Sequence, residues 1–194
     1  MKFYIHEALR RTCQNLYGDR ALIRVDALLS LMHELQDAEE LVKLEKVNKF
    51  FNQLLYVSDS RTWNRKEYWA SRLEFLGKGQ GDCEDYAVAK YLTLKQLGVE
   101  EVFLTYAIMT PSEERHLLVI YKGELGYSYL DNYNQEIKAV HERIDFVPVY
   151  AFNEDTAFVQ DIQGNFGTPL AQTLKPQRKL RNIDQEIFAE EEKS

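Results

Sequence analysis

One of the chain's two cysteines, Cys83, lies in the stretch GDCEDYAVAKY, residues 81–91, at the predicted start of a helix. A helix N-terminus stabilises negative charge and therefore lowers the pKa of a thiol placed there. The neighbouring acids Asp82, Glu84 and Asp85 act in the opposite direction, because nearby negative charge raises the pKa of a thiol. Two explanations suit these acids: they cap the helix, or they bind a cation such as Ca²⁺, which takes carboxylate oxygens as ligands.

A nucleophilic cysteine also needs a base, usually a histidine, and a group that orients the base. Of the four histidines in the chain, His116 opens an apolar segment beside charged turn residues, and Asp131 ends the next predicted strand. The start of one strand lies beside the end of its antiparallel neighbour, so we expect His116 and Asp131 to meet across the hairpin. Cys83, His116 and Asp131 are thus candidates for a catalytic set. Taken alone, a cysteine entering an apolar helix is more often a packing residue.

The hydrophobic pattern predicts the elements that must position these candidates. Apolar residues recur at helical spacing in the first half, whereas β-branched and aromatic runs bounded by turn residues follow in the second half. We expect helices at residues 19–36, 38–55 and 83–97, and strands at residues 102–109, 116–123, 127–132 and 146–153. The last strand contains Pro148, which favours an edge position. Helices followed by an antiparallel sheet predict an α+β fold, with N-terminal helices packed on the sheet.

The same pattern predicts the domain organisation. Residues 1–160 carry the apolar runs and are long enough for one domain with a substantial core. Apolar density then falls, so residues 161–194 are expected to form a loosely packed C-terminal tail with one short helix near residues 182–190. The aromatic stretch before Cys83, residues 61–81, is expected to be a loop.

Composition excludes several classes of protein. The formal net charge of −7 argues against a nucleic-acid binder, which needs a clustered basic surface. Two cysteines are too few for a disulfide framework or a thiolate zinc site. No apolar run is long enough to span a membrane. Glu7 interrupts the short apolar stretch of MKFYIHEALRR, which therefore does not predict an export signal.

The surroundings of the three candidates resemble a known family. The stretches YWASRLEFLGKGQGDCEDYAVAKYLTLKQLG, RHLLVIY, LDN and PVYAFN are similar to the bacterial transglutaminase-like cysteine proteinases of the LapG type, over roughly residues 15 to 155. The resemblance implies a papain-like or transglutaminase-like fold with the catalytic cysteine at a helix N-terminus. It implies that Cys83 is the nucleophile, His116 the general base and acid, and Asp131 the orienting carboxylate.

The resemblance also implies a cofactor, a substrate and a partner. The cofactor is Ca²⁺, held by Asp82 and Glu84, with Asp85 as a further ligand. The activity is that of a periplasmic cysteine endopeptidase, which cuts the N-terminal region of a large cell-surface adhesin and so releases biofilm cells. The implied inhibitor is an inner-membrane receptor of the LapD type, which sequesters the protease when its cytoplasmic part binds cyclic dimeric GMP. Trp63 and Trp69 are our candidates for the partner surface if they are exposed, although aromatic residues here also suit core packing.

Two alternatives stay open on the sequence. Another acyl-transfer enzyme of the same fold, a transglutaminase or an amidase, would use the same three residues with a different acceptor. A non-catalytic binding module would keep the fold around an unreactive Cys83. Analysis of the reaction products distinguishes an endopeptidase from a transglutaminase or an amidase. The reactivity of the Cys83 thiol distinguishes an enzyme from a non-catalytic binding module.

Overall fold

The computed structural model describes residues 2–124, 126–183 and 185–190. In these ranges the helices are α1 (Glu7–Tyr17), α2 (Asp19–Leu35), α3 (Glu40–Phe51), α4 (Asp59–Thr62), α5 (Arg72–Lys78), α6 (Cys83–Gln96), α7 (Lys175–Arg181) and the 3-10 helix η1 (Val140–Glu142). The strands are β1 (Lys2–Tyr4), β2 (Leu55–Tyr56), β3 (Gln80–Gly81), β4 (Val102–Met109), β5 (Arg115–Gly123), β6 (Gly126–Leu130), β7 (Lys138–Ala139), β8 (Phe146–Phe152), β9 (Ala157–Gln160), β10 (Phe166–Pro169) and β11 (Phe188–Glu190). Most helices precede the main sheet, as the sequence predicts.

The main sheet has seven strands in the order β10-β9-β8-β4-β5-β6-β7, and all neighbouring strands are antiparallel. Strands β5 and β6 form a hairpin in which Val119 lies opposite Leu130. Asp131 follows β6 directly, so this register brings it beside the first residues of β5. The hairpin therefore brings two of the three candidate residues close to each other.

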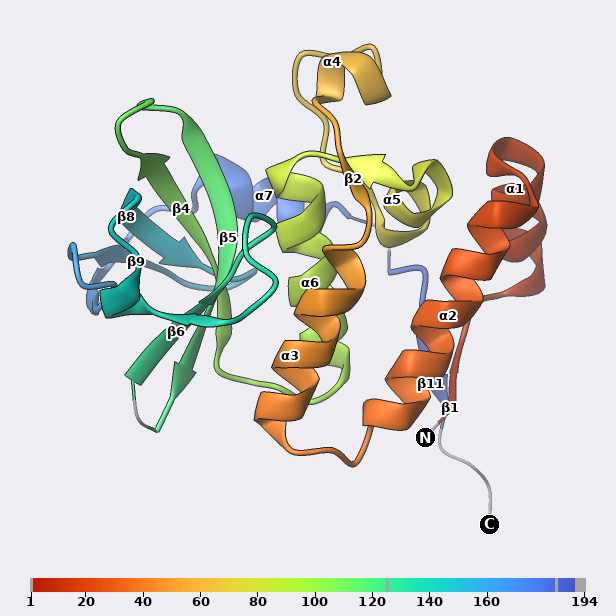
Figure 1. Ribbon diagram of the computed structural model, residues 1–194, viewed down its shortest axis with the longest axis horizontal. Coiled ribbons are helices and arrows are strands. Elements are labelled where there is room, and N and C mark those ends of the chain that lie inside the picture. Colours follow the sequence, from red (N-terminus) through yellow and green to blue (C-terminus); the bar gives the residue numbers. More distant parts are fainter. Residues whose placement is uncertain (1, 125, 184, 191–194) are drawn as a thin grey trace.

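Helix α6 is the central element of the structure (Figure 1). It packs on β4 and β5 on one side and on α3 on the other, while α1 and α2 lie further from the sheet. Every residue of α6 from Asp85 to Leu94 is buried. Because the helix is enclosed on several sides, its N-terminus and Cys83 are held in a fixed position relative to β5. No helix in the described ranges has the length and apolar character needed to cross a membrane.

Strand β8 is not the edge strand that Pro148 led us to expect, because β9 and β4 flank it. Proline is tolerated here for two local reasons. The β4–β8 register shifts between Tyr106 and Ala107, which marks a bulge next to Pro148. Strand β9 pairs with β8 only from Tyr150 to Phe152, so no β9 residue is paired with Pro148.

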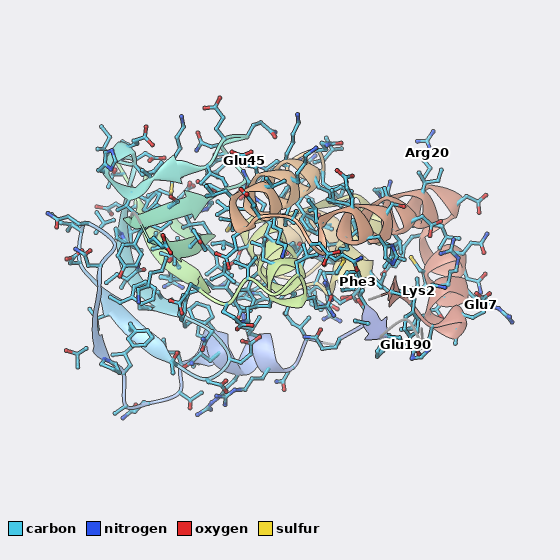
Figure 2. The ribbon with its side chains drawn as sticks, turned by 90° about the horizontal axis from the view of Figure 1, so that it is seen from below. Lys2, Phe3, Glu7, Arg20, Glu45 and Glu190 are labelled. Atoms are coloured by element: carbon cyan, nitrogen blue, oxygen red, sulfur yellow. The ribbon has the colours of Figure 1, made fainter. Side chains whose placement is uncertain are left out.

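The C-terminal segment also differs from the expected loose tail. Strand β10 extends the main sheet, and the helix lies at Lys175–Arg181 rather than near residues 182–190. Leu180 and Ile187 are buried in the core. Strand β11 pairs with β1, and Figure 2 shows Glu190 beside Lys2 and Phe3. The described part of this segment therefore packs on the main body, because Leu180 and Ile187 are buried in the core and β11 pairs with β1.

The stretch expected to be a loop before Cys83, residues 61–81, contains the end of helix α4, the whole of helix α5 and the short strand β3. Helix α5 begins at a capping box in which the side chains of Ser71 and Glu74 exchange hydrogen bonds with each other's backbone N–H. It ends at Gly79, which has the left-handed φ of 67° typical of a glycine at a helix C-terminus. Sequence reasoning missed this helix because it is short and its aromatic flanks obscure the apolar spacing.

Candidate active site

Helix α6 places Cys83 at its first position, and the thiol lies in a nearly closed site, 6% exposed. The Cys83 Sγ donates a hydrogen bond to Glu84 Oε2 at 2.9 Å. Burial raises the pKa of the thiol well above its ordinary value, and the charge of Glu84 raises it further. The backbone N–H of Leu117 acts in the opposite direction as a hydrogen-bond donor to the sulfur. Cys83 therefore lies beside the residue that follows His116.

The structure brings His116 and Asp131 together. His116 Nε2 and Asp131 Oδ1 lie 2.8 Å apart, and both side chains are buried. An ionised carboxylate only accepts hydrogen bonds, so the proton belongs on Nε2 and the other ring nitrogen, Nδ1, remains free to accept one. The ring of Tyr133 stacks on His116 with centroids 5.0 Å apart and planes 11° from parallel. The imidazole is thus fixed in its plane and in its tautomer.

Asp131 is ionised because its two polar partners outweigh its burial. Burial alone would raise the pKa of this carboxyl, which is 1% exposed. Its hydrogen bond with His116 and its ion pair with Arg143 instead hold the pKa below the ordinary value. Arg143 Nη2 lies 2.7 Å from Asp131 Oδ2. Sequence reasoning missed Arg143, because nothing in the stretch around it distinguishes a buried arginine from a surface one.

Three aspartates, Asp59, Asp82 and Asp85, form a compact group in which one oxygen of each lies within 4.8 Å of the others. Burial is the largest cause that raises the pKa of all three, and the negative charge of Glu84 raises it further; the pKa of Asp85 reaches about 7. Asp85 Oδ1 accepts from the N–H of Ala70 at 2.9 Å, but Asp59 Oδ1 and Asp82 Oδ1 are buried without a hydrogen-bond partner among the described residues. Buried carboxylates in this arrangement suit a divalent cation, which would supply the missing partner and the missing charge.

This group differs from the sequence-based set in one member. Asp82 and Asp85 belong to it, whereas the Glu84 carboxylate faces the thiol instead. Asp59, which sequence reasoning missed, comes from the start of α4, far along the chain. No local pattern links residue 59 to residue 82, so only the fold brings them together. The capping explanation is met in part: Asp85 Oδ2 accepts from the N–H of Asp82 at 3.4 Å.

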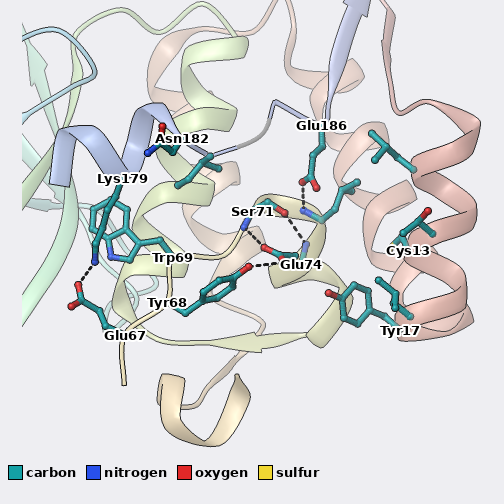
Figure 3. A pocket seen from close by; sticks show the side chains of 15 residues that line it. Cys13, Tyr17, Glu67, Tyr68, Trp69, Ser71, Glu74, Lys179, Asn182 and Glu186 are labelled. Atoms are coloured by element: carbon teal, nitrogen blue, oxygen red, sulfur yellow. Dashed lines mark hydrogen bonds and ion pairs between the residues drawn. The ribbon is translucent and has the colours of Figure 1, made fainter. Parts of the chain in front are cut away.

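Neither of the two tryptophans is fully exposed. Trp63 packs against Tyr68 with ring centroids 4.9 Å apart, and Lys78 lies over its ring. Trp69 lines a pocket of about 540 Å³ between α1, the segment that precedes α5, and α7. Figure 3 shows Lys179 beside the indole and the Tyr68–Glu74 hydrogen bond that forms part of the wall. Trp69 thus lines a pocket, whereas Trp63 packs against Tyr68 and Lys78.

Comparison with known proteins identifies the family. Residues 27–159 match the sequence profile of the family described as bacterial transglutaminase-like cysteine proteinase BTLCP. The chain belongs to the bacterial transglutaminase-like cysteine proteinases. The matched range contains Cys83, His116, Asp131 and the three grouped aspartates. A search of curated proteins finds no match.

Solved structures of Legionella pneumophila LapG are similar to this bacterial transglutaminase-like proteinase over most of its length. Calcium-bound LapG is 30% identical with a TM-score of 0.74, covering 90% of this chain and 96% of LapG. EGTA-treated LapG is 31% identical with a TM-score of 0.72, covering 90% and 94%. A further LapG structure is 34% identical with a TM-score of 0.68, covering 79% and 86%. The predicted family and the predicted transglutaminase-like α+β fold are confirmed.

Proposed function

We propose that this protein is a calcium-dependent cysteine endopeptidase in which Cys83, His116 and Asp131 form the catalytic triad. The observation that carries the proposal is the buried His116–Asp131 hydrogen bond beside a cysteine at a helix N-terminus. Membership of a cysteine proteinase family supports the reaction class.

The geometry supports acyl transfer through a thioester. His116 Nδ1 takes the proton of the Cys83 thiol, and the thiolate attacks the carbonyl carbon of the peptide bond. The C–N bond then breaks, and His116 returns the proton to the leaving amine. Water hydrolyses the thioester by the reverse proton transfers and restores the thiol. The N–H of Cys83, at the start of α6, is our candidate for one donor to the oxyanion.

The acidic group is our candidate for the calcium site. Asp59, Asp82 and Asp85 provide oxygen ligands of the type that Ca²⁺ prefers, and two of their oxygens have no other partner among the described residues. Glu84 is kept as a fourth candidate because it adjoins Asp82 and Asp85. A bound cation there would neutralise the acids and fix the loop that carries Cys83. The calcium-bound LapG of L. pneumophila supports the choice of metal.

The substrate and the regulator are proposed from the family resemblance. The substrate is the N-terminal region of a large surface adhesin, and its cleavage releases biofilm cells. The inhibitor is a LapD-type inner-membrane receptor controlled by cyclic dimeric GMP, which places the protease in the periplasm. Trp69, which faces the pocket beside α7, is the candidate contact for this receptor, with Trp63 next to it.

The proposal is tested by incubating the purified protein with an adhesin N-terminal fragment, with Ca²⁺ or with EGTA. Mass spectrometry should find two peptides that sum to the fragment plus one water, only with Ca²⁺. Cross-linked products or loss of ammonia would point to a transglutaminase or an amidase instead. The Cys83→Ala variant, which removes only a small side chain, is the control. Intact fragment with the wild type in Ca²⁺ would count against the proposal.

A further inference from the structure

Arg143 links the Asp131 carboxylate to a second acid, Asp145. Its Nη2 lies 2.7 Å from Asp131 Oδ2, and its Nε and Nη2 lie 2.8 and 2.9 Å from the two oxygens of Asp145. The guanidinium packs on the ring of Phe146, with Cζ 4.5 Å from the ring centroid. The side chain is only 4% exposed. It is therefore a buried, oriented cation rather than a surface ion pair.

We infer that Arg143 is a positioning residue that keeps Asp131 ionised and so holds His116 in its reactive tautomer. This inference rests on the proposed function of the triad. While His116 acts as the base it is neutral, so it cannot balance the charge of a buried carboxylate. An arginine keeps its charge under these conditions, and its planar fork fixes the orientation of the carboxylate.

Lys90 is another cation near Asp131, and it cannot take this role. It lies on α6, two turns after Cys83, and its amino group is buried without a hydrogen-bond partner among the described residues. Burial lowers the pKa of Lys90 to about 7. Arg143, in contrast, contacts the Asp131 carboxylate directly. Of these two cations, Arg143 is the one with a fixed charge and a fixed contact.

The consequence of losing Arg143 follows from the hydrogen-bonding roles. Without it, the buried Asp131 would either take up a proton or draw one onto His116. A protonated Asp131 donates to Nε2, which moves the imidazole proton to Nδ1, the atom that must accept from the thiol. A protonated His116 likewise has no free nitrogen. Both results remove the neutral base with its proton on Nε2.

The test compares Arg143→Met with Arg72→Met. Arg72 is also buried, but its hydrogen bonds go to Thr93 and Gln96 on α6, away from Asp131. Both variants lose a buried guanidinium, so both should have a lower melting temperature. Only Arg143→Met should lose the neutral Nε2–H signature of His116 in ¹H–¹⁵N spectra of histidine-labelled protein. Assignment uses a His116→Gln variant, and the remaining three histidines serve as internal references.

The kinetic expectation is a fall in kcat by about 10²-fold with little change in KM for Arg143→Met, since a buried positioning residue does not contact substrate. Unlike Lys90, a lysine at position 143 would pair directly with the Asp131 carboxylate, so Arg143→Lys should keep a cation there and retain the Nε2–H tautomer; this variant decides the question if Arg143→Met does not fold. An unchanged His116 spectrum in Arg143→Met, or loss of the tautomer in Arg143→Lys, would overturn the inference. The spectra need neither substrate nor Ca²⁺, so they decide the role of Arg143 even if no protease activity is found.

Discussion

The thiol of Cys83 donates a hydrogen bond to the carboxylate of the next residue, Glu84, with Sγ and Oε2 2.9 Å apart. The Glu84 carboxylate therefore faces the nucleophile. The carboxylates of Asp59, Asp82 and Asp85 form a separate group that does not include Glu84. The acids around the cysteine thus divide into one that contacts the thiol and others that suit a cation. This division makes the roles of Glu84 and Asp59 separable by experiment.

Asp59→Asn should weaken calcium binding more than Glu84→Gln. The first change removes one charged ligand from the group of three aspartates, and we expect the Kd for Ca²⁺ to rise by about tenfold or more. The second removes a carboxylate that faces the thiol. Isothermal titration of both variants with Ca²⁺ measures the difference. A larger loss in Glu84→Gln would return Glu84 to the ligand set and remove Asp59 from it.

Gly81→Ala should disturb the same site by steric overlap. A Cβ at Gly81 would fall 2.8 Å from the Cβ of Asp85, which is closer than side-chain atoms pack. Asp85 would have to move, so stability should fall by about 1–3 kcal/mol and calcium affinity should fall with it. Thermal unfolding with and without Ca²⁺ measures both effects.

Gly98→Ala is the matched control for this change. Gly98 has a φ of 81°, and apart from the adjoining residues no described atom lies within 4 Å of the position that an alanine methyl would take, so alanine there meets backbone strain but no packing neighbour. It should cost about 1–2 kcal/mol and leave the calcium-induced rise in melting temperature intact. An equal loss of the calcium effect in both glycine variants would mean that general destabilisation, not Asp85, is responsible.

Long elements with regular spacing could be predicted from the sequence. Helices α2 and α6 and strands β4 and β5 lie within a residue or two of their predicted ends, because each has a continuous apolar pattern. The short elements could not be predicted: α5 has a single capping box as its signal, and the Leu180 and Ile187 that anchor the C-terminal segment stand among polar residues. The edge position predicted from Pro148 is wrong because a bulge accommodates the proline inside the sheet, and no local sequence pattern predicts that bulge.

The candidate site shows the same limit. Cys83, His116 and Asp131 could be proposed because a helix start and a hairpin are local features. Asp59 and Arg143 could not, because no strand pairing or helical spacing links Asp59 to Asp82 or Arg143 to Asp131. A buried ion pair or a metal ligand leaves no periodic signal, since only the finished fold decides which polar side chains are enclosed.

Trp69→Ala should weaken binding to the periplasmic domain of the proposed receptor. Trp69 lines the pocket of about 540 Å³, and an aromatic contact at the centre of an interface typically contributes about 2 kcal/mol or more, roughly 30-fold in Kd. Ile162→Ala, at an exposed residue outside this pocket, is the control and should bind normally. Biolayer interferometry measures both. Normal binding by Trp69→Ala would move the interface elsewhere.

Asp131→Asn should lower activity and change how stability depends on pH. The wrong tautomer of His116 is favoured, so kcat should fall by about 10⁴-fold while the Cys83→Ala variant shows no cleavage.

In the folded protein the pKa of Asp131 lies below its unfolded value of 3.8, so the native state binds fewer protons there than the unfolded state. Its contribution to stability is therefore complete above about pH 5 and is lost as the pH falls, with a slope of at most about 1.4 kcal/mol per pH unit. Urea unfolding from pH 7 to pH 3 should show the wild-type and Asp131→Asn free energies converging in acid; parallel curves would mean that Asp131 is not held ionised by His116 and Arg143.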